Sequence, residues 1–471
     1  MVATPEHDEF DIVVIGGGPG GYATALYGAS AGLNIAVVER DKVGGTCLHR
    51  GCIPAKEFLE TASVMRTVAG AKDFGVQAGQ PAVDFSISQG RKQKIVDQLH
   101  KGLVGLMQGR GITTVVGHGT LLADLTVQVQ EDGSDRTIQG RTVVLAAGSA
   151  PRTIPGFEVD GRLVLTSDEV LALEELPGSV AVIGGGAIGC EFASMLADLG
   201  TQVTLLEVLP GLLAGCDEDV VNVVNRSFRK RGIKVHTGVQ VHGHSPSGDG
   251  TTVSFGEGQS VTVDAVIISV GRRPLSDGLV AAEVGLAVDE RGFVVVDEWM
   301  RTSIESVFAL GDLVNTPQLA HVGFAEAIVA VKTVLGEEVV PVDYSRVPWC
   351  IYSHPEVAFA GMSERAARDT GLDVIVKKDP FGGNSRARIV GETEGLVKVI
   401  AERQPSGQVG RILGVHMVGP WVTEQLGAGY LAVNWEATPE DVSQFIQPHP
   451  TLSESFGETV LALTGRGLHV G

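Results

Sequence analysis

Two cysteines separated by four residues are the first candidates for chemistry in this chain. Cys47 and Cys52 stand in the segment GGTCLHRGCIPAK, residues 44–56. The thiolate is the reactive form of cysteine, and a helix N-terminus or a nearby cation lowers the thiol pKa toward neutrality. We expect one turn of helix to bring the two sulfurs together, with Arg50 and His49 adding positive charge. Such a pair could cycle between a dithiol and a disulfide.

The same cysteine spacing also occurs in structural pairs and in half of a metal site. A zinc site needs further Cys or His ligands at matching spacing, and the sequence has no second pair of this kind, so we predict no metal. The remaining cysteines, Cys190, Cys216 and Cys350, lie in apolar or loop contexts typical of cysteine used as a small hydrophobe. An odd total of five does not describe a secreted disulfide framework.

A histidine and a glutamate near the C-terminus form the second candidate. His449 and Glu454 lie in QPHPTLSES, residues 447–455, at the start of an expected helix. Thiol exchange needs a proton acceptor, because a thiol with an intrinsic pKa of about 8.5 is mostly protonated at neutral pH. Histidine titrates in the useful range, and a carboxylate can orient it and stabilise its cation. We interpret His354 and His416 as packing or interface residues.

Two glycine-rich turns follow one plan. Each comes after a short apolar run, opens a helical stretch and is followed by a glutamate 23 residues after its first glycine. The first copy has Gly16, Gly18, Gly21 and Glu39, and the second has Gly184, Gly186, Gly189 and Glu207. Glycines in this context let backbone amides approach a pyrophosphate at a helix N-terminus, while the carboxylate binds ribose hydroxyls. The alternatives are glycine turns required only for folding and solvated glutamates at strand ends.

Glu207 also indicates which nicotinamide dinucleotide is used. A carboxylate at this position hydrogen-bonds a free 2′-hydroxyl and repels a 2′-phosphate. The residues that follow, VLPGLL, include no arginine to receive a phosphate. The second site is therefore predicted to bind NAD in preference to NADP.

These motifs require parallel sheets to position them. Continuous apolar strands that alternate with helices indicate sheets covered on both faces, so the fold class is α/β, with two Rossmann-like dinucleotide domains followed by a C-terminal α+β domain. Turn-rich exits occur at residues 145–156 and 266–274. We place domains at 1–150, 151–274 and 346–471, and expect 275–345 to return and complete the first domain.

Composition limits the possible partners. The chain has 471 residues and a net charge of −20, from 36 Lys plus Arg against 56 Asp plus Glu. This balance disfavours nucleic acid and anionic membrane surfaces. No uninterrupted apolar stretch reaches the eighteen or so residues of a membrane span, and MVATPEHDEF resembles neither a signal nor a transit peptide. We expect a cytoplasmic protein.

Taken together, these segments resemble the class I pyridine nucleotide-disulfide oxidoreductases over essentially the whole chain, and most closely their dihydrolipoamide dehydrogenase family. The resemblance implies FAD in the first domain, NAD in the second and a homodimer formed by the third. It implies that Cys52 faces the flavin as a thiolate and that Cys47 exchanges with the substrate dithiol. His449 would be the base for the other subunit's site, with Glu454 beside it. The reaction would oxidise dihydrolipoamide carried on lipoyl domains of 2-oxoacid dehydrogenase or glycine-cleavage complexes.

The resemblance carries further residues. Lys56 and Glu191 match an ion pair beside the flavin, and Asp312 in FALGD matches the aspartate that binds the ribityl chain. Gly148 and Gly271, in the two exits, join the predicted cofactor-binding residues. In the alternative interpretation Lys56 is a solvated helix lysine and Asp312 a turn former.

The chain departs from the family pattern at His49, Arg50 and Ala55, and our hypothesis is that Arg50 raises the thiolate fraction. A glutathione or mycothiol disulfide reductase is the main rival, although glutathione reductases usually prefer NADP, which Glu207 disfavours. Mercuric reductase and high-molecular-weight thioredoxin reductase would need a further cysteine pair at the C-terminus. The last alternative is a structural flavin-containing subunit in which catalysis is secondary.

Overall fold

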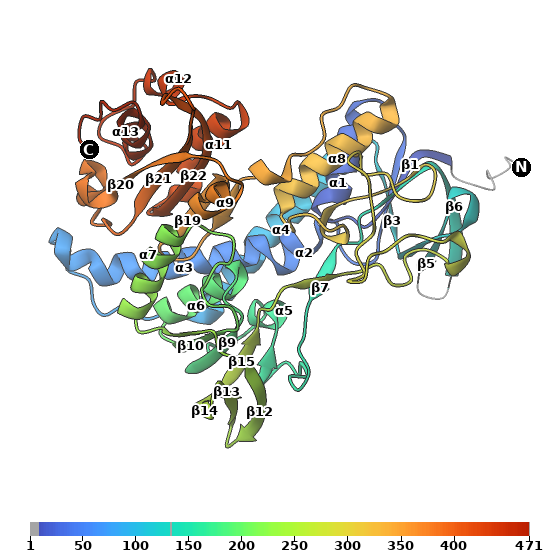
Figure 1. Ribbon diagram of the computed structural model, residues 1–471. Helices are drawn as coiled ribbons and strands as arrows, with labels where there is room; N and C mark the ends of the chain where they lie inside the picture. The colour runs from blue at the N-terminus through green and yellow to red at the C-terminus, as the bar shows by residue number, and fades with distance from the viewer. Residues whose placement is uncertain (1–8, 132–133, 471) are drawn as a thin grey trace, which may run out of the picture. The chain divides into compact units, whose positions relative to one another are not determined.

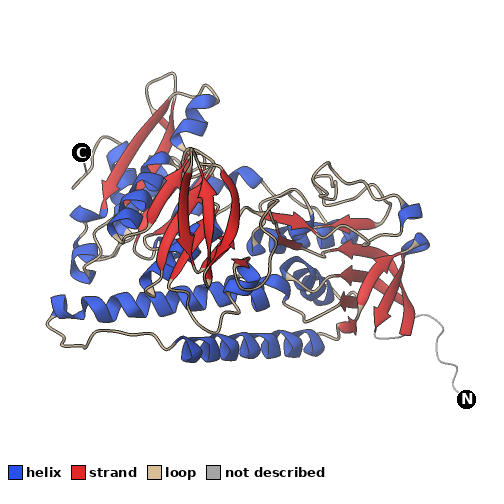
Figure 2. Cartoon of the chain, turned by 90° about the horizontal axis from the view of Figure 1, so that it is seen from below, coloured by secondary structure: helices blue, strands red, loops and turns tan. Residues whose placement is uncertain are grey.

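The computed structural model describes residues 9–131 and 134–470, and it divides into two compact units (Figure 1). Unit 1 joins the chain up to Glu57 with Phe85–Arg152 and Gly271–Tyr344. Unit 2 joins Phe58–Asp84, Thr153–Val270 and the chain from Ser345 onward. The strands gather into several separate sheets (Figure 2). Each unit is described by itself below.

The main sheet of unit 1 has the strand order β3-β2-β1-β6-β5-β4, with β17 also paired to β6. Its strands are β1 (Glu9–Ile15), β2 (Ile35–Glu39), β3 (Thr113–Val116), β4 (His118–Leu121), β5 (Thr126–Glu131), β6 (Ser134–Leu145) and β17 (Val307–Ala309). Strands β2 and β6 run parallel to β1, one on each side of it, and β17 runs parallel to β6. In β1, Ile12, Val13 and Val14 are fully buried, as expected for a strand covered on both faces.

The helices of unit 1 carry the predicted chemical groups. They are α1 (Pro19–Ser30), α2 (Gly45–Arg50), the start of α3 (Cys52–Gly70), α4 (Phe85–Gly109) and α8 (Ala320–Leu335), with 3-10 turns at Ala123–Leu125 and Gly311–Leu313. Helices α1 and α8 lie side by side (Figure 1). Their backbones approach closely because glycines face each other, and a Cβ at Gly323 of α8 would lie 3.4 Å from the backbone nitrogen of Gly20 in α1.

The two exits predicted from the sequence pair with each other. Strand β7 (Ser149–Pro151) is antiparallel to β16 (Arg272–Pro274). Strand β17 then joins the sheet that contains β1 and β6, so the returning segment and the first segment share one sheet in unit 1. The bounds of the four segments proposed from the sequence stay a prediction.

Unit 2 contains a second parallel sheet, of order β11-β10-β9-β15-β8. Its strands are β8 (Val164–Leu165), β9 (Ser179–Ile183), β10 (Gln202–Glu207), β11 (Lys234–Thr237) and β15 (Ala265–Ile268). Helices α5 (Ser167–Val170), α6 (Ala187–Asp198) and α7 (Glu218–Lys230) belong with it. An antiparallel meander follows, formed by β12 (Val241–Ser247), β13 (Gly250–Phe255) and β14 (Gln259–Val263). The strand, turn and helix predicted at each glycine motif are confirmed in both copies.

The C-terminal part of unit 2 is an antiparallel sheet with helices packed on it. The strands are β18 (Trp349–Ile351), β19 (Glu356–Gly361), β20 (Val374–Pro380), β21 (Leu396–Arg403) and β22 (Val409–Gly419), in the order β18-β19-β22-β21-β20. The helices are α9 (Glu364–Asp369), α10 (Ser385–Val390), α11 (Val422–Asn434), α12 (Pro439–Ser443) and α13 (Glu454–Leu463). The core of this sheet includes the buried Phe381, Val415 and Met417. The predicted α/β class with a C-terminal α+β domain is confirmed.

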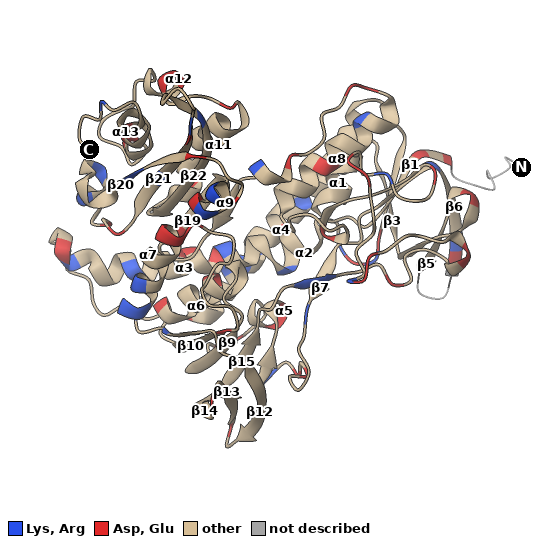
Figure 3. Ribbon diagram, in the orientation of Figure 1, with Lys and Arg blue, Asp and Glu red and all other residues tan. Residues whose placement is uncertain are grey.

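A buried lysine connects β21 to two helices of unit 2. The amine of Lys398, whose side chain is 2% exposed, lies 2.9 Å from Asp217, 2.7 Å from Asp219 and 2.8 Å from Glu364. Asp217 caps α7, and Glu364 begins α9. Figure 3 marks acidic and basic residues on the ribbon of these two helices. The cluster therefore ties the parallel-sheet region of unit 2 to its antiparallel sheet.

Among the described helices, none has the length and apolar character needed to cross a bilayer.

Candidate active site

The first glycine motif forms a tight strand-to-helix turn. Gly16 has φ +107°, and a Cβ there would lie 2.3 Å from the Ala146 carbonyl oxygen. A Cβ at Gly21 would lie 1.8 Å from the Gly16 carbonyl oxygen, whereas Gly18 faces open space. The Glu39 carboxylate accepts the backbone amides of Gly17 at 2.7 Å and of Asp41 at 2.9 Å. The glutamate therefore holds both loops at this edge of the sheet.

The second motif repeats this geometry contact by contact. Gly184 has φ +108°, and its Cβ would lie 2.3 Å from the Ser269 carbonyl oxygen. A Cβ at Gly189 would lie 1.9 Å from the Gly184 carbonyl oxygen, and Gly186 again faces open space. Glu207 accepts the amides of Gly185 at 2.5 Å and of Leu209 at 2.7 Å. The common spacing seen in the sequence thus reflects a common local structure.

Both motifs fit a dinucleotide. Gly18 and Gly186 are the N-caps of α1 and α6, and neither supplies a side-chain cap to the first-turn amides. Open space beside a helix N-terminus whose amides have no side-chain cap is what a pyrophosphate needs. We therefore infer that α1 would hold the pyrophosphate of FAD and α6 that of NAD.

Cys47 and Cys52 are brought together, but by two helices and not by one turn. Cys47 lies in the first turn of α2, Cys52 is the first residue of α3, and Gly51 between them has non-helical dihedrals of −147° and −111°. A side chain at Gly51 would press on the Thr46 carbonyl oxygen at 3.0 Å. The expectation of a single helical turn was wrong, because the chain breaks at this glycine. Both sulfurs consequently lie near a helix N-terminus.

The two thiols form a coupled pair. A hydrogen bond between the side chains of Cys47 and Cys52 raises the pKa of the Cys47 thiol, and burial and the negative charge of Cys52 raise it further. The positive charge of Lys56 acts in the opposite direction. Because the two thiols share a proton, they titrate as a pair, and Lys56 favours the negatively charged form of that pair. The separate roles of Cys52 as the flavin-facing thiolate and Cys47 as the exchanging thiol stay a prediction.

The positive charge expected from Arg50 and His49 is not directed at the sulfurs. Arg50 pairs with Asp41 at 2.5 Å on the exposed side of α2. His49 donates from Nε2 to the Val43 carbonyl oxygen, 2.9 Å away, and burial lowers its pKa. Lys56, one helical turn after Cys52, is the cation that acts on Cys47. We therefore replace the Arg50 hypothesis with one in which Lys56 favours the thiolate.

Tyr22 is a neighbour of the thiol pair that the sequence analysis missed. Burial raises the pKa of Tyr22 to about 12, and the charges of Cys47 and Cys52 add to the effect. Its ring lies 5.7 Å from that of Phe324, centroid to centroid. The available signal was its place directly after Gly21, at the start of the helix that the glycine motif opens.

Asp312 lies in a polar network with both exits of the domain. Its Oδ2 accepts the Ser149 hydroxyl at 2.5 Å, and Arg272 Nε lies 3.6 Å away. Arg272 also donates to the Ser149 hydroxyl at 2.7 Å and to its carbonyl oxygen at 2.8 Å. Gly148 and Gly271, adjacent to this network, have φ of +75° and +102° and face open space. Nothing in the sequence pointed to Ser149 or Arg272.

The predicted partners Lys56 and Glu191 belong to different units. Within unit 2, Glu191 is buried in α6 and accepts the Tyr352 backbone amide at 2.9 Å. Their ion pair stays a prediction.

His449 and Glu454 do meet. His449 Nδ1 lies 2.8 Å from Glu454 Oε1, and the Thr451 amide donates to the other carboxylate oxygen at 2.7 Å. Glu454 is the first residue of α13, whereas the His449 side chain is 70% exposed. The carboxylate thus holds Nδ1 of an exposed imidazole, as a base serving a substrate would require.

The remaining candidates are structural. His416 is fully buried, hydrogen-bonds the Met362 carbonyl oxygen at 2.8 Å and stacks on Phe359. Burial lowers the pKa of His354 to about 3. Cys190 is buried in α6, and burial raises its pKa.

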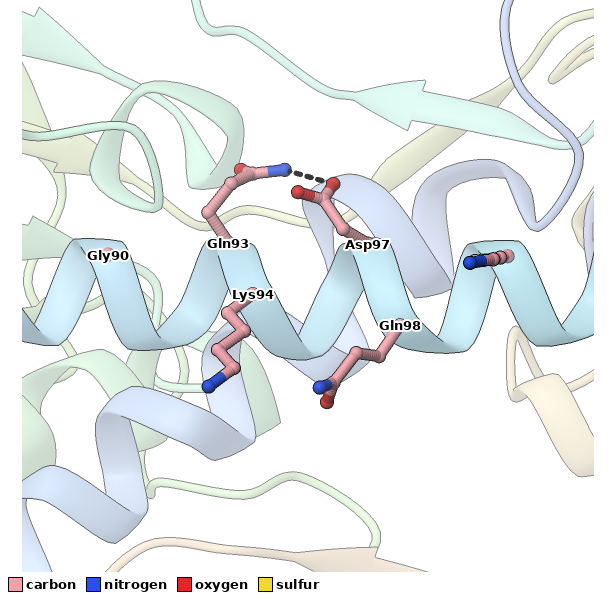
Figure 4. A pocket seen from close by; sticks show the side chains of 6 residues that line it. Gly90, Gln93, Lys94, Asp97 and Gln98 are labelled. Carbon is pink, nitrogen blue, oxygen red and sulfur yellow. Dashed lines mark hydrogen bonds between the residues drawn. The ribbon is translucent and has the colours of Figure 1, made fainter.

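Within the described residues, no cluster of His, Cys, Asp or Glu could hold a metal ion. A hollow of about 510 Å³ lies on unit 1, but a single helix, α4, lines it (Figure 4). Its side chains include Gln93 and Asp97, which hydrogen-bond each other at 2.8 Å. We assign it no part in the site.

Comparison with known proteins agrees with this geometry. The family model of the pyridine nucleotide-disulphide oxidoreductases matches residues 10–327, and that of their dimerisation domain matches residues 347–460. The chain belongs to the pyridine nucleotide-disulphide oxidoreductase family. The dimerisation match supports the predicted homodimer.

Relatives of the chain within this family are similar along almost their entire length. A dihydrolipoyl dehydrogenase of Bacillus subtilis is 40% identical over 475 residues, which cover 98% of this chain and 99% of the relative. The mitochondrial dihydrolipoyl dehydrogenase of Pisum sativum is 34% identical over 471 residues, covering 98% and 93%.

Solved structures show the same arrangement of the chain. LpdA from Mycobacterium tuberculosis has a TM-score of 0.90 and 25% identity, covering 97% of this chain and 99% of LpdA. The HOCl-induced flavoprotein disulfide reductase RclA from Escherichia coli, in a Cu(II) complex, has a TM-score of 0.87 and 27% identity, with 97% and 99% covered. The predicted enzyme class, a flavoprotein disulfide oxidoreductase that uses FAD and NAD, is confirmed.

Proposed function

We propose that the chain is a dihydrolipoyl dehydrogenase, which oxidises dihydrolipoamide to lipoamide and reduces NAD. The observation that carries the proposal is the contact between Cys47 and Cys52 at the starts of α2 and α3. The full-length similarity to dihydrolipoyl dehydrogenases supports the choice of substrate. The contact of Glu207 with two loop amides supports NAD, because the carboxylate is held where a 2′-phosphate would meet its charge.

Dihydrolipoamide is oxidised by thiol–disulfide exchange, which reduces the cysteine pair of the enzyme. A substrate thiolate attacks Cys47 of the oxidised pair, the Cys47–Cys52 bond breaks, and Cys52 leaves as a thiolate. The second substrate thiolate then attacks the substrate sulfur of the mixed disulfide, which releases lipoamide and leaves Cys47 reduced. His449 accepts a thiol proton in these steps, and Glu454 stabilises the resulting imidazolium through Nδ1. We propose that His449 of one subunit serves the cysteine pair of the other.

Bound FAD supplies a two-electron relay from the dithiol to NAD. The residues of the chain would hold the cofactor in place and stabilise charge at the thiol pair. Gly16 and Gly21 permit the tight turn, and Gly18 leaves open space for the first dinucleotide. Asp312, whose carboxylate is held by the Ser149 hydroxyl, would bind the ribityl chain. Lys56 stabilises negative charge at the thiol pair.

The physiological electron donors are proposed to be lipoyl domains of 2-oxoacid dehydrogenase or glycine-cleavage complexes, in keeping with the substrate of the relatives. We also propose a cytoplasmic location.

The deciding experiment is a steady-state assay of the purified holoenzyme with dihydrolipoamide and NAD beside glutathione and mycothiol disulfides with NADH or NADPH. We expect turnover to favour dihydrolipoamide and NAD clearly. A preference for either disulfide with NADPH would contradict the proposal. Cys47→Ser and Cys52→Ser should each abolish dihydrolipoamide turnover, and retained turnover in either variant would point to a structural role instead.

A further inference from the structure

Glu326 is a buried carboxylate in α8 that the reaction above does not use. Its relative exposure is 0%, and a carboxylate is rarely buried unless hydrogen bonds or a cation satisfy it. One of its oxygens accepts the backbone amide of Gly311 at 2.7 Å, and the other contacts the Tyr344 hydroxyl at 3.0 Å. A single side chain therefore connects two segments that are distant in sequence.

These two segments have different tasks. Gly311 begins the turn that carries Asp312, whose carboxylate is held by Ser149 and lies near Arg272. Tyr344 is the last residue of unit 1, directly before the chain enters the C-terminal domain. Glu326 thus links the turn proposed to hold the flavin's ribityl chain with the linker into the dimerisation domain.

The contact with Tyr344 has two possible hydrogen-bonding states. When Glu326 is ionised, the Tyr344 hydroxyl donates to it. When Glu326 is protonated, the carboxyl group donates to the Tyr344 oxygen, and the hydroxyl hydrogen can turn toward Met300 Sδ, 4.0 Å away. Met300 is buried and has φ +69°. This backbone conformation is strained for any residue other than glycine, so the surrounding residues must stabilise it.

The surroundings of Glu326 move the pKa of its carboxyl group close to neutral pH. Burial raises the pKa of Glu326 to about 7 and the charge of Asp312 raises it too, while hydrogen bonding by Thr316, Gly311 and Tyr344 opposes the shift. Helix α1, packed along α8, has no Asp, Glu, Lys, Arg or His and offers only Tyr22 and Tyr27 as titratable groups. Other titratable or charged groups on α8 and on the segments of Met300 and Tyr344 are His321, Lys332, Asp297, Glu298, Arg301, Asp343 and Arg346.

We propose that Glu326 is a positioning residue whose ionisation sets how firmly the Gly311–Asp312 turn is held, and that Tyr344 carries this state to the linker. A hydrogen bond from an amide to a charged oxygen is roughly twice as strong as one to a neutral oxygen. The turn is consequently held firmly when Glu326 is ionised and loosened when it takes up a proton. The consequence for FAD rests on the proposed role of Asp312.

The first test measures the proton itself. Infrared spectra of the full-length holoenzyme are recorded from about pH 5.5 to about pH 8.5, a range that brackets a carboxyl group titrating near neutrality. We expect a protonated-carboxyl band that disappears as pH rises and is missing in Glu326→Gln. The matched control is Glu356→Gln, which removes another carboxylate whose pKa burial raises, hydrogen-bonded by Thr423. A neutral-range band that keeps its full intensity in Glu326→Gln would overturn the proposal.

The second test measures the turn through release of FAD, followed by the fluorescence of the freed cofactor. In the wild type we expect release several-fold faster at about pH 6 than at about pH 8, on either side of the titration. Glu326→Gln should show the fast rate at both pH values, and Glu356→Gln should keep the wild-type dependence. An unchanged pH dependence in Glu326→Gln, or a slow rate at both pH values, would overturn the proposal.

Two further variants keep the outcome interpretable. Tyr344→Phe removes a donor to the ionised carboxylate, so the infrared titration and the release midpoint should both move to higher pH even if Glu326→Gln does not fold. No movement in that variant would also overturn the proposal. Asp312→Asn tests the proposed function separately. If this variant releases FAD at the wild-type rate, Asp312 does not bind FAD, whereas the infrared titration of the same variant still reports on Glu326.

Discussion

At the scale of single residues, the reactivity of Cys47 depends on the balance of its neighbours. The side-chain hydrogen bond to Cys52, burial and the negative charge of Cys52 all favour the protonated thiol. The positive charge of Lys56 opposes them, as does a hydrogen bond to the Cys52 backbone. Thiol exchange requires a thiolate, so the thiol pKa of the pair must stay close enough to neutral pH for the thiolate to form. Lys56 is therefore the residue whose removal should affect the chemistry most directly without touching sulfur.

We predict that Lys56→Met raises the pKa of the Cys47 thiol by about 1 unit or more, the usual effect of losing a nearby opposite charge. Thiolate absorbance of the reduced enzyme, titrated against pH, measures this shift. Arg50→Ala is the matched control and should leave the titration unchanged, because Arg50 is already paired with Asp41. A larger effect of Arg50→Ala than of Lys56→Met would restore the original hypothesis.

A second prediction concerns the base. His449→Ala should lower dihydrolipoamide oxidation by roughly 10²- to 10⁴-fold, the usual contribution of general acid-base catalysis. Reduction of ferricyanide by NADH, which bypasses thiol exchange, should be nearly unchanged. Equal losses in both assays would indicate a structural role for His449.

The residues that could be predicted from sequence are those whose partners are close along the chain. Cys47 with Cys52 and His449 with Glu454 are five residues apart, so their spacing together with the family motifs indicated the contact. Ser149, Arg272 and Glu326 meet their partners only after the chain has folded, and no local pattern marks them. Arg50 illustrates the opposite error, in which sequence proximity suggested a contact that Asp41 prevents.

At the scale of elements, the two glycine motifs were predictable because backbone geometry requires their glycines. Positive φ at Gly16 and Gly184, and close contact at Gly21 and Gly189, exclude other residues. The break at Gly51 was not predictable, since a glycine within a helical pattern is often tolerated. The sequence therefore indicated the elements correctly but not the division of α2 from α3.

The contrast between glycines of one motif is a third prediction. Gly189→Ala places a Cβ 1.9 Å from the Gly184 carbonyl oxygen and should destabilise the protein by about 1–3 kcal/mol, as overpacking does. Gly186→Ala meets nothing in the protein itself, so thermal unfolding should be close to wild type while NADH binding weakens. Calorimetry and NADH titration of both variants measure the difference. A large loss of thermal stability in Gly186→Ala would refute the assignment of that open space to a ligand.

At the scale of the whole molecule, the Lys398 cluster joins the two sheets of unit 2. Burial alone would lower the pKa of Lys398, but its hydrogen bonds to three carboxylates raise it overall. Asp217 is equally buried, with 2% side-chain exposure. Removing the lysine would leave that carboxylate without its cation, which is costlier than never having buried the pair.

Our fourth prediction is that Lys398→Met lowers the free energy of unfolding by about 3–5 kcal/mol at neutral pH. Bonding to Lys398 helps to hold the pKa values of Asp217, Asp219 and Glu364 below their ordinary values. Their stabilising effect is complete above the ordinary carboxyl values and is lost as pH falls below about 4. The deficit of the variant, followed by denaturant unfolding, should accordingly shrink in acid. A deficit that is constant from neutral pH to acid would exclude this linkage.

The near identity of the two glycine turns has a consequence for nucleotide selectivity. FAD and NAD share an adenosine diphosphate half, and the two turns offer that half almost the same glycines, helix start and glutamate. The recognition of flavin or nicotinamide must then come from what surrounds each turn. Free ADP, lacking either ring, should compete at both places with similar affinity.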